Sequence, residues 1–404
     1  MADYKGIDYL RRRLEEKRRR VKLRYRYYDM KEKIRDFGIS TPPALRAWTS
    51  SLGWCAKAVD SLSDRLVFDG FRDDIFDLSA IYQQNNPDVL FRSAIQGALI
   101  ASCSFLYIYE GDDGFPVVEC IDAANATGEI DTRTGLLTEG YAVLARSKND
   151  KPIMEAYFQP GMTTYIEGGR ISRVYTHDAP APLLVPVIYK ADATRPFGHS
   201  RITRACMDHV GAAVRTIKRS EISAEFYAFP QKWATGLDED ADLFDRWQAT
   251  MASILTFTKD QNGDRPTVGQ FQQQAMTPHL EQLRMFASLF AGETGLTLDD
   301  LGFPSDNPSS ADAIRSQHEN LRLAAKRAQK DFFIGILNAG YLAACLRDKF
   351  PYLRRQLVTT KGVWEPIFAP DAAQLAGIGD AILKIQQSFP EYFTENKLRD
   401  LTGI

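Results

Sequence analysis

The chain has 404 residues, of which 44% are hydrophobic and 25% are charged, values that are typical of a soluble globular protein with an ample core. No apolar run reaches the roughly 18 residues that a membrane span needs. The basic N-terminal segment is not followed by the apolar stretch of a signal peptide. These features exclude disordered and collagen-like classes, and we expect a protein made in a cytosol-like compartment without membrane contact.

The cysteines are Cys55, Cys103, Cys120, Cys206 and Cys345. Their odd number, wide spacing and lack of a Cys-x-x-Cys pair argue against a disulfide framework and against a zinc site. We expect them to be small buried side chains.

Positive charge is concentrated near the N-terminus. The formal net charge is −2, but ten Lys or Arg residues lie between Arg11 and Arg26 against Glu15 and Glu16, so the remaining chain carries about −10. Residues 8–36 have the pattern of a basic helix with a thin apolar stripe. Such a helix could contact a polyanion or an acidic partner, but a solvated face or an ion-pair strip between subunits is the favoured interpretation.

Two further helices are predicted before the first strands. Residues 38–43 include two prolines after a hydroxyl residue, so they end the basic helix and form a turn. Apolar residues at helical spacing then run from Trp48 to Leu66, and a third helical pattern covers residues 87–103. Both patterns are typical of core helices.

The periodicity changes to that of strands between Phe105 and Lys190. Short β-branched and aromatic segments alternate with turn signals such as Asp112-Asp113-Gly114 and Pro160-Gly161. The expected strands are 105–109, 116–121, 141–144, 153–158, 163–166, 171–175 and 184–189. Their spacing predicts an antiparallel meander.

A long helix with a narrow apolar stripe is expected from Ile202 to about Phe226, a pattern that suits a helix with few neighbours. A small α/β insertion is predicted next, with strands at 229–237 and 254–271 around a short helix. Residues 277–291 are again helical.

The longest predicted helix follows a turn. Asn307-Pro308 disfavours helical geometry, and Ser309 with Asp312 can form a capping-box-like start. From there to Arg347 the chain contains no proline, and apolar residues recur every three, four or seven positions, which predicts one helix of roughly 55 Å. Helical pieces at 372–387 and 394–401 complete the chain.

The sequence offers little for catalysis. It has no Gly-Lys dipeptide and hence no phosphate-binding P-loop, and Gly198-His199-Ser200 lacks the second glycine of a nucleophile elbow. Asp260, Asn262 and Asp264 begin like a calcium loop but lack its later glycine and glutamate. We predict no catalytic, cofactor-binding or metal-binding residues.

Short motifs in collinear order resemble the SPP1-like family of tailed-phage portal proteins over roughly residues 25–400. They include Tyr27-Tyr28-Asp29, residues 38–43, residues 59–66, Asp69-Gly70-Phe71, residues 198–202, Phe229-Pro230-Gln231, residues 268–271, Thr294-Gly295-Leu296, Leu301-Gly302-Phe303 and residues 307–314. No single motif decides the matter, but their order is specific.

The resemblance implies a non-enzymatic ring of typically twelve subunits with an axial DNA channel. It implies an α+β portal fold with these parts: a wing at 1–198 made of N-terminal helices and the β meander, stem helices at 199–227 and 277–292, a clip at 228–276, a tunnel loop at 293–309, a long tunnel helix at 310–348 and a short helical crown at 349–404.

The same resemblance implies partners and a location. The partners would be further copies of the chain, the terminase large subunit, head-completion or adaptor proteins, major capsid and scaffold proteins, and double-stranded DNA that passes without sequence-specific contact. The ring would form in the host bacterial cytoplasm and serve packaging and ejection at the portal vertex of the virion.

Two sets of residues are expected to make these contacts. Polar and small side chains of the tunnel loop would approach DNA, namely Thr297, Asn307, Ser309 and Ser310. Clip contacts with partner proteins are assigned to Gln231, Trp233 and Gln270.

Two alternatives stay open. One is another head connector or minor head protein. The other, much weaker, is a metal-dependent nucleic-acid enzyme that uses carboxylates around Asp299, Asp300, Asp306 and Asp312.

Overall fold

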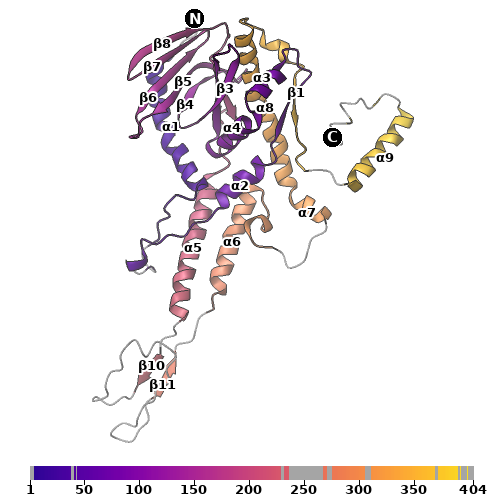
Figure 1. Ribbon diagram of the computed structural model, residues 1–404. Coiled ribbons are helices and arrows are strands. Elements are labelled where there is room, and N and C mark those ends of the chain that lie inside the picture. The colour runs from indigo at the N-terminus through magenta and orange to yellow at the C-terminus, as the bar shows by residue number, and fades with distance from the viewer. Residues whose placement is uncertain are drawn as a thin grey trace, which may run out of the picture. The chain divides into compact units, whose positions relative to one another are not determined.

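The computed structural model describes residues 4–37, 41, 43–228, 232–235, 267–270, 275–304, 311–368, 372–389, 392 and 398. The chain forms two compact units. One consists of Met1–Glu32, Gly53–Met207 and Gly292–Ile404, and the other of Lys33–Leu52 and Asp208–Ala291. Helices α5 (Arg204–Ala228) and α6 (Thr277–Thr294) each contribute residues to both units (Figure 1).

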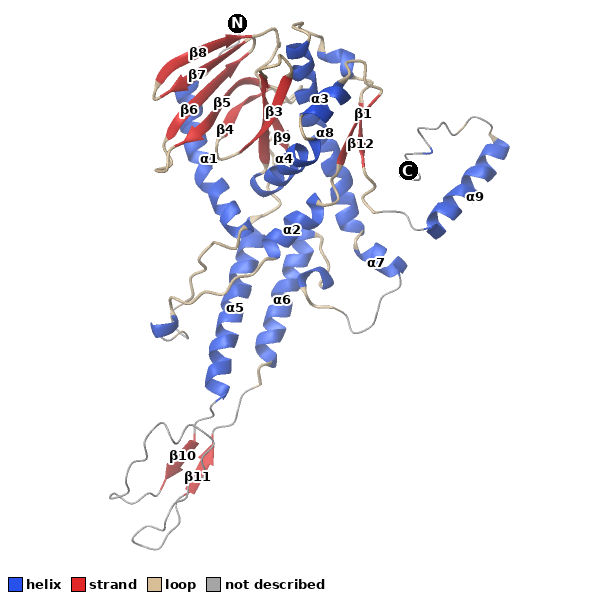
Figure 2. Ribbon diagram, in the orientation of Figure 1, coloured by secondary structure: helices blue, strands red, loops and turns tan. Residues whose placement is uncertain are grey.

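In its described residues, the larger unit contains three antiparallel sheets (Figure 2). The five-stranded sheet has the order β4 (Ala126–Ile130), β5 (Leu137–Arg146), β6 (Pro152–Gln159), β7 (Met162–Glu167) and β8 (Arg170–Thr176). The three-stranded sheet has the order β3 (Pro116–Asp122), β2 (Cys103–Glu110) and β9 (Leu184–Ile188). β1 (Phe68–Arg72) pairs with β12 (Lys361–Trp364).

Several helices belong to this unit. They are α1 (Ile7–Tyr28), α2 (Trp54–Ser63), α3 (Leu78–Gln84), α4 (Pro87–Ala101), α7 (Ala311–Gln317), α8 (Glu319–Arg347) and α9 (Ala372–Ser388), with 3₁₀ turns η2 (Asp299–Leu301) and η3 (Arg354–Leu357). Both α4 and α8 pack on β2, whose first six residues are buried. α8 approaches β9 closely at Gly335, where a Cβ atom would lie 2.7 Å from the Pro186 carbonyl oxygen.

The structure differs from the sequence prediction in the arrangement of the strands. The predicted meander is divided between two sheets, because β3 and β9 each pair with β2, whereas β4 to β8 pair among themselves. Strand β4, helix α3 and the β1–β12 pair were not predicted. The second predicted helix begins at Trp54, and Trp48 lies before it as an exposed side chain.

The long predicted helix is interrupted at His318, so α7 and α8 are separate helices. The His318 Nδ1 atom lies 2.9 Å from the Ile314 carbonyl oxygen, so its side chain shares this acceptor with the helical main chain. The main-chain N–H of His318 is shared between the carbonyls of Ile314 and Arg315. Such side-chain competition for backbone acceptors is a recognised cause of helix bending.

Helix α1 is fixed to the five-stranded sheet by a buried carboxylate at its start. Leu10 and Leu14 pack with Tyr141 and Val143 of β5. Glu139 is 1% exposed, and its carboxylate accepts the main-chain N–H groups of Lys5 at 2.9 Å and Gly6 at 3.2 Å. An anion at this position satisfies free N–H groups and complements the positive end of the helix dipole.

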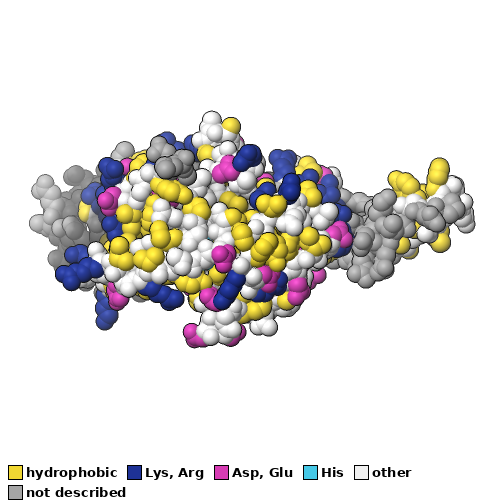
Figure 3. Space-filling model, turned by 90° about the horizontal axis from the view of Figure 1, so that it is seen from above, with side chains coloured by type: hydrophobic (Ala, Val, Ile, Leu, Met, Phe, Trp, Pro, Cys, Tyr) yellow, Lys and Arg dark blue, Asp and Glu magenta, His cyan; other side chains and the backbone are white. Residues whose placement is uncertain are grey.

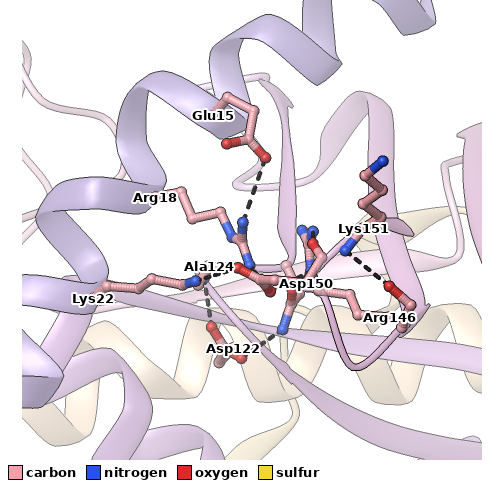
Figure 4. Close-up of polar contacts among 10 residues, drawn as sticks. Glu15, Arg18, Lys22, Asp122, Ala124, Arg146, Asp150 and Lys151 are labelled. Carbon is pink, nitrogen blue, oxygen red and sulfur yellow. Dashed lines mark hydrogen bonds and ion pairs between the residues drawn. The ribbon is translucent and has the colours of Figure 1, made fainter. Parts of the chain in front are cut away.

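The basic side chains of α1 pair with acidic groups of the same sheet. Arg11 forms two parallel hydrogen bonds with Glu155 of β6, at 3.0 and 3.1 Å. Figure 4 shows Arg18 and Lys22 directed at Asp150 in the β5–β6 turn, with 2.6 Å between Lys22 Nζ and Asp150 Oδ2. Hydrogen bonds from these two cations lower the pKa of Asp150 to about 2.

Several positive charges of α1 are therefore paired with acidic side chains of the same chain. Lys5 and Arg13 also pair with Glu129 of β4. The outward-facing side chains Arg12, Arg19 and Arg20 are exposed, so part of the positive charge still meets solvent.

The smaller unit consists mainly of α5 and α6. Thr216 of α5 lies 3.1 Å from the Gln282 side chain of α6. Lys218 pairs with Asp36 at 2.9 Å, which holds the segment after α1 against α5. The unit also contains η1 (Pro43–Leu45) and the antiparallel pair β10 (Lys232–Thr235) and β11 (Thr267–Gln270).

We predict that Glu155→Ala lowers the free energy of unfolding by about 1–3 kcal/mol, because Arg11 and the buried Tyr141 hydroxyl both lose their acceptor. Asp8→Ala is the matched control, since it removes the exposed second partner of Arg11 and should change stability by no more than about 0.5 kcal/mol. Urea denaturation followed by circular dichroism measures both. Equal losses in the two variants would contradict the role of Glu155.

Candidate functional site

The segment before α5 has a structural role. Ser200 is 6% exposed, and its hydroxyl donates to the Ile100 carbonyl at 2.6 Å and accepts the Ile202 N–H at 2.9 Å. His199 Nε2 lies 2.6 Å from Asp192 Oδ2. The serine is thus held against the end of α4 and is not presented as a nucleophile.

Gly198 is required by the path of the backbone. Its φ of +72° lies in the left-handed region, and an added Cβ atom would lie 2.1 Å from the Tyr189 carbonyl oxygen. That oxygen also accepts the main-chain N–H of His199 at 2.9 Å. Only glycine can satisfy both the angle and the close approach.

Arg201 connects distant segments below this turn. Its side chain is 93% buried, and its guanidinium donates to the carbonyl oxygens of Ala58 in α2 and Thr294 at the end of α6, the latter at 2.8 Å. Its main-chain N–H donates to Leu99 of α4 at 2.8 Å. Thr294 is the last residue of α6, where the helix dipole is negative and favours a cation.

The described part of the predicted tunnel loop begins with a reciprocal hydrogen-bonded pair. The Thr297 N–H and hydroxyl both donate to Asp300 Oδ2, at 3.0 and 2.9 Å, and the Asp300 N–H donates back to the Thr297 hydroxyl at 3.1 Å. This is the geometry of a capping box, and it fixes the turn η2. Gly302 then ends the turn with a φ of +91°.

Asp300 also links this turn to the break between α7 and α8. His318 Nε2 lies 3.3 Å from Asp300 Oδ2, while its Nδ1 contacts Ile314. Burial opposes ionisation of Asp300, but the hydrogen bonds from Thr297 and the neighbouring His318 outweigh it and lower the pKa of this carboxyl. One carboxylate therefore holds both the turn and the helix break.

The structure describes only some of the residues that the sequence assigned to DNA and partner contacts. Thr297 is half-buried, and its hydroxyl is bonded to Asp300. Asn307, Ser309 and Ser310 lie outside the described residues, as does Gln231. Trp233 and Gln270 lie in the β10–β11 pair, opposite Gly269 and Lys232 respectively. The roles of all seven remain predictions.

The described residues place no assembled metal site around the acidic cluster. Asp306 lies outside them, and among the described residues no group of three or more His, Cys, Asp or Glu side chains could hold a metal ion. In the same part of the chain, none of the helices has both the length and the apolar content required to cross a membrane.

A family model described as phage portal protein, SPP1 Gp6-like, matches residues 7–344. The chain belongs to this portal family. The predicted family and the α+β portal fold are thereby confirmed, and the members of the family are structural proteins and not enzymes.

Individual relatives and solved structures share only low sequence identity with this chain. The portal protein of Mycobacterium phage L5 is 26% identical over 338 residues, which cover 76% of this chain and 67% of the relative. The portal protein of Mycobacterium phage D29 is 24% identical over 335 residues, with the same coverage. A solved structure of the neck of a native gene transfer agent particle, computed with C12 symmetry, matches with 12% identity over 92% of this chain and 95% of that chain, at a TM-score of 0.48.

Sequence reasoning missed several residues that hold this portal fold together. Glu139, Glu155 and Arg201 were not singled out, because burial of a charged side chain has no local sequence signal. The Thr297-x-x-Asp300 spacing is that of a capping box, so this pair could have been recognised from the sequence.

We predict that Gly198→Ala prevents normal folding or lowers stability by more than about 3 kcal/mol, since it combines a left-handed φ with a steric clash against backbone. Gly168→Ala is the control, because Gly168 also has a positive φ, of +57°, but nothing lies within 4 Å of its Cβ position. The control should lose only about 1 kcal/mol. Soluble yield and thermal unfolding measure the difference, and similar losses would show that the clash is relieved at little cost.

Proposed function

We propose that this chain is the subunit of a closed ring, with twelve copies as the expected number, that forms a conduit for double-stranded DNA at the portal vertex of a phage capsid. The observation that carries the proposal is membership of the portal family over residues 7–344. Assembly in the host bacterial cytoplasm and function in DNA packaging and ejection belong to the same proposal.

An exposed apolar face on α6 supports assembly with further copies. Ala287 and Phe290 are fully buried, whereas Met285 and Leu289, one helical turn apart, are each 49% exposed. A helix with apolar residues beyond its buried side normally packs against something else. In a ring, each copy meets its two neighbours through different surfaces, so such a face can be covered by a neighbouring copy.

We assign the parts of the proposed ring as the family resemblance implies. The wing is 1–198, the stem 199–227 and 277–292, the clip 228–276, the tunnel loop 293–309, the tunnel helix 310–348 and the crown 349–404. The clip would meet the terminase large subunit and later the head-completion or adaptor proteins, with contacts that include Gln231, Trp233 and Gln270. Major capsid and scaffold proteins would surround the ring.

The charge distribution suits a conduit. A strongly basic wall would bind many phosphates at once and oppose sliding of the DNA. In this chain, several cations of α1 are paired with acidic groups of its own sheet, and the net charge is −2. Weak, sequence-independent contact with DNA is consistent with this pattern.

The ring is tested by the mass and image of the purified full chain, using analytical ultracentrifugation and negative-stain microscopy. We expect rings with a central hole for the parent chain, and Met285→Glu/Leu289→Glu should shift the mass distribution strongly toward single chains, because it places charges on the proposed contact. Asp380→Glu should leave assembly unchanged. A parent chain that stays monomeric even with scaffold and capsid proteins would overturn the proposal.

The tunnel loop is tested separately, in a packaging assay with terminase and procapsids. We propose that Thr297, Asn307, Ser309 and Ser310 approach the DNA, so deletion of residues 297–307 should strongly reduce the amount of DNA packaged while rings still form. Unchanged packaging by intact mutant rings would show that this loop has no role in DNA passage.

A further inference from the structure

An open apolar groove lies beside α8 in the larger unit. It has a volume of about 440 Å³, between α8 and the chain that runs from η3 toward β12. Its apolar lining includes Phe333, Ile334, Leu337, Tyr341, Leu357 and Val358. Val358 is 86% exposed and Ile334 is 49% exposed, so the described residues of this chain do not fill the groove.

Helix α9 carries an apolar stripe that the described residues bury only in part. Leu375, Ile378, Ile382 and Ile385 of α9, and Phe389 directly after its last residue, follow one another at spacings of three, four, three and four, which places them on one side of the helix. Phe389 is 65% exposed and Ile385 is 39% exposed, and apolar side chains are visible on α9 in Figure 3. Within the described residues, the side chains of 375–389 make no hydrogen bond, ion pair or ring contact with another element.

The opposite side of α9 carries its charged residues, and Leu383, which also lies away from the stripe, is 59% exposed. The only charged residues of the helix, Asp380 and Lys384, lie one turn apart and away from the stripe. A 17-residue helix is only marginally stable in water without packing, so α9 needs a surface on which to bury its stripe. A helix whose anchors recur at three and four positions fits a groove lined by apolar side chains.

We propose that α9 of one copy occupies the α8–η3 groove of a neighbouring copy. This inference rests on the proposed ring. Each copy would then donate one helix and receive one, a heterologous contact that can close around any number of copies. Direct pairing of α9 with α9 would be isologous, and would join copies only in pairs.

The chain itself links the two surfaces. Thr360 lines the groove, β12 follows directly, and seven residues separate Trp364 from Ala372. Even when fully extended, such a connection spans only roughly 25 Å, so α9 must act near the groove of its own copy or of an adjacent one.

Two variants of the full chain, each with one added cysteine, test the proposal. Ile382→Cys places a thiol on the stripe of α9, and Val358→Cys places one in the groove. The two proteins, one of them carrying a mass tag, are assembled together and mildly oxidised. We expect a disulfide-linked heterodimer of one tagged and one untagged chain, because a bond between these two thiols can form only between copies.

The control replaces Ile382→Cys by Lys384→Cys, on the charged side of α9, and should give no such product. The parent chain is oxidised in parallel because Cys120 is half-buried and the other four native cysteines are buried. Cross-linking of Ile382→Cys with itself would overturn the proposal in favour of α9–α9 pairing. In the doubly substituted chain, a disulfide within one copy without linked dimers would show that α9 folds onto its own groove.

The result is read together with the mass of the parent protein. If rings form and the mixed variants give no linked dimer, the α9 proposal is wrong and the ring remains. If the parent forms no ring even with scaffold and capsid proteins, the proposed function fails, and a linked dimer would then reveal α9 exchange outside a ring.

Discussion

A buried arginine that is hydrogen-bonded to main-chain carbonyls is the interaction on which the larger unit depends. Arg201 joins α2, α4 and the end of α6 through Ala58, Leu99 and Thr294, which are far apart in the sequence. Burial of a cation is costly unless its donors are satisfied, and carbonyl groups at a helix C-terminus are well placed to do so. The turn before Arg201 positions this side chain, and that turn requires the left-handed Gly198 and the buried hydroxyl of Ser200.

The basic N-terminal helix illustrates how charge counts can mislead. From the sequence, its ten cations could face a polyanion, solvent or a neighbouring subunit. The structure adds a fourth arrangement, in which Glu155 and Asp150 from strands β5–β6 and their turn pair with the helix inside one chain. Pairing of residues more than a hundred positions apart depends on tertiary packing, which local periodicity does not encode.

Local structure was predictable where a single physical rule governed it. The apolar spacing located the cores of α4, α6 and α8, and β-branched segments located β2, β3 and β6. The division into two sheets could not be predicted, because strand alternation indicates a strand but not its partner. At the helix break, the His318 side chain contacts Asp300, which lies eighteen residues earlier, and a helical pattern does not encode a contact at that separation.

In the candidate site, too, local contacts could be predicted from the sequence and tertiary contacts could not. The spacing of Thr297 and Asp300 is enough to predict the hydrogen bonds between them. The burial of Glu139 and Arg201, in contrast, becomes evident only in the fold. Family membership was nevertheless recognisable, because the order of many weak motifs is a stronger signal than any one of them.

The two proposed contacts between copies would reinforce each other. Once the α6 face holds two copies together, α9 and the neighbouring groove meet at an effective concentration that is on the order of millimolar for a short linker. The α9 contact can then be weak between free chains and still be occupied in the assembly. This would allow the apolar stripe of α9, in which Ile385 and Phe389 are exposed, to remain incompletely buried in a single chain, because further burial is gained only when the neighbouring copy is already in place.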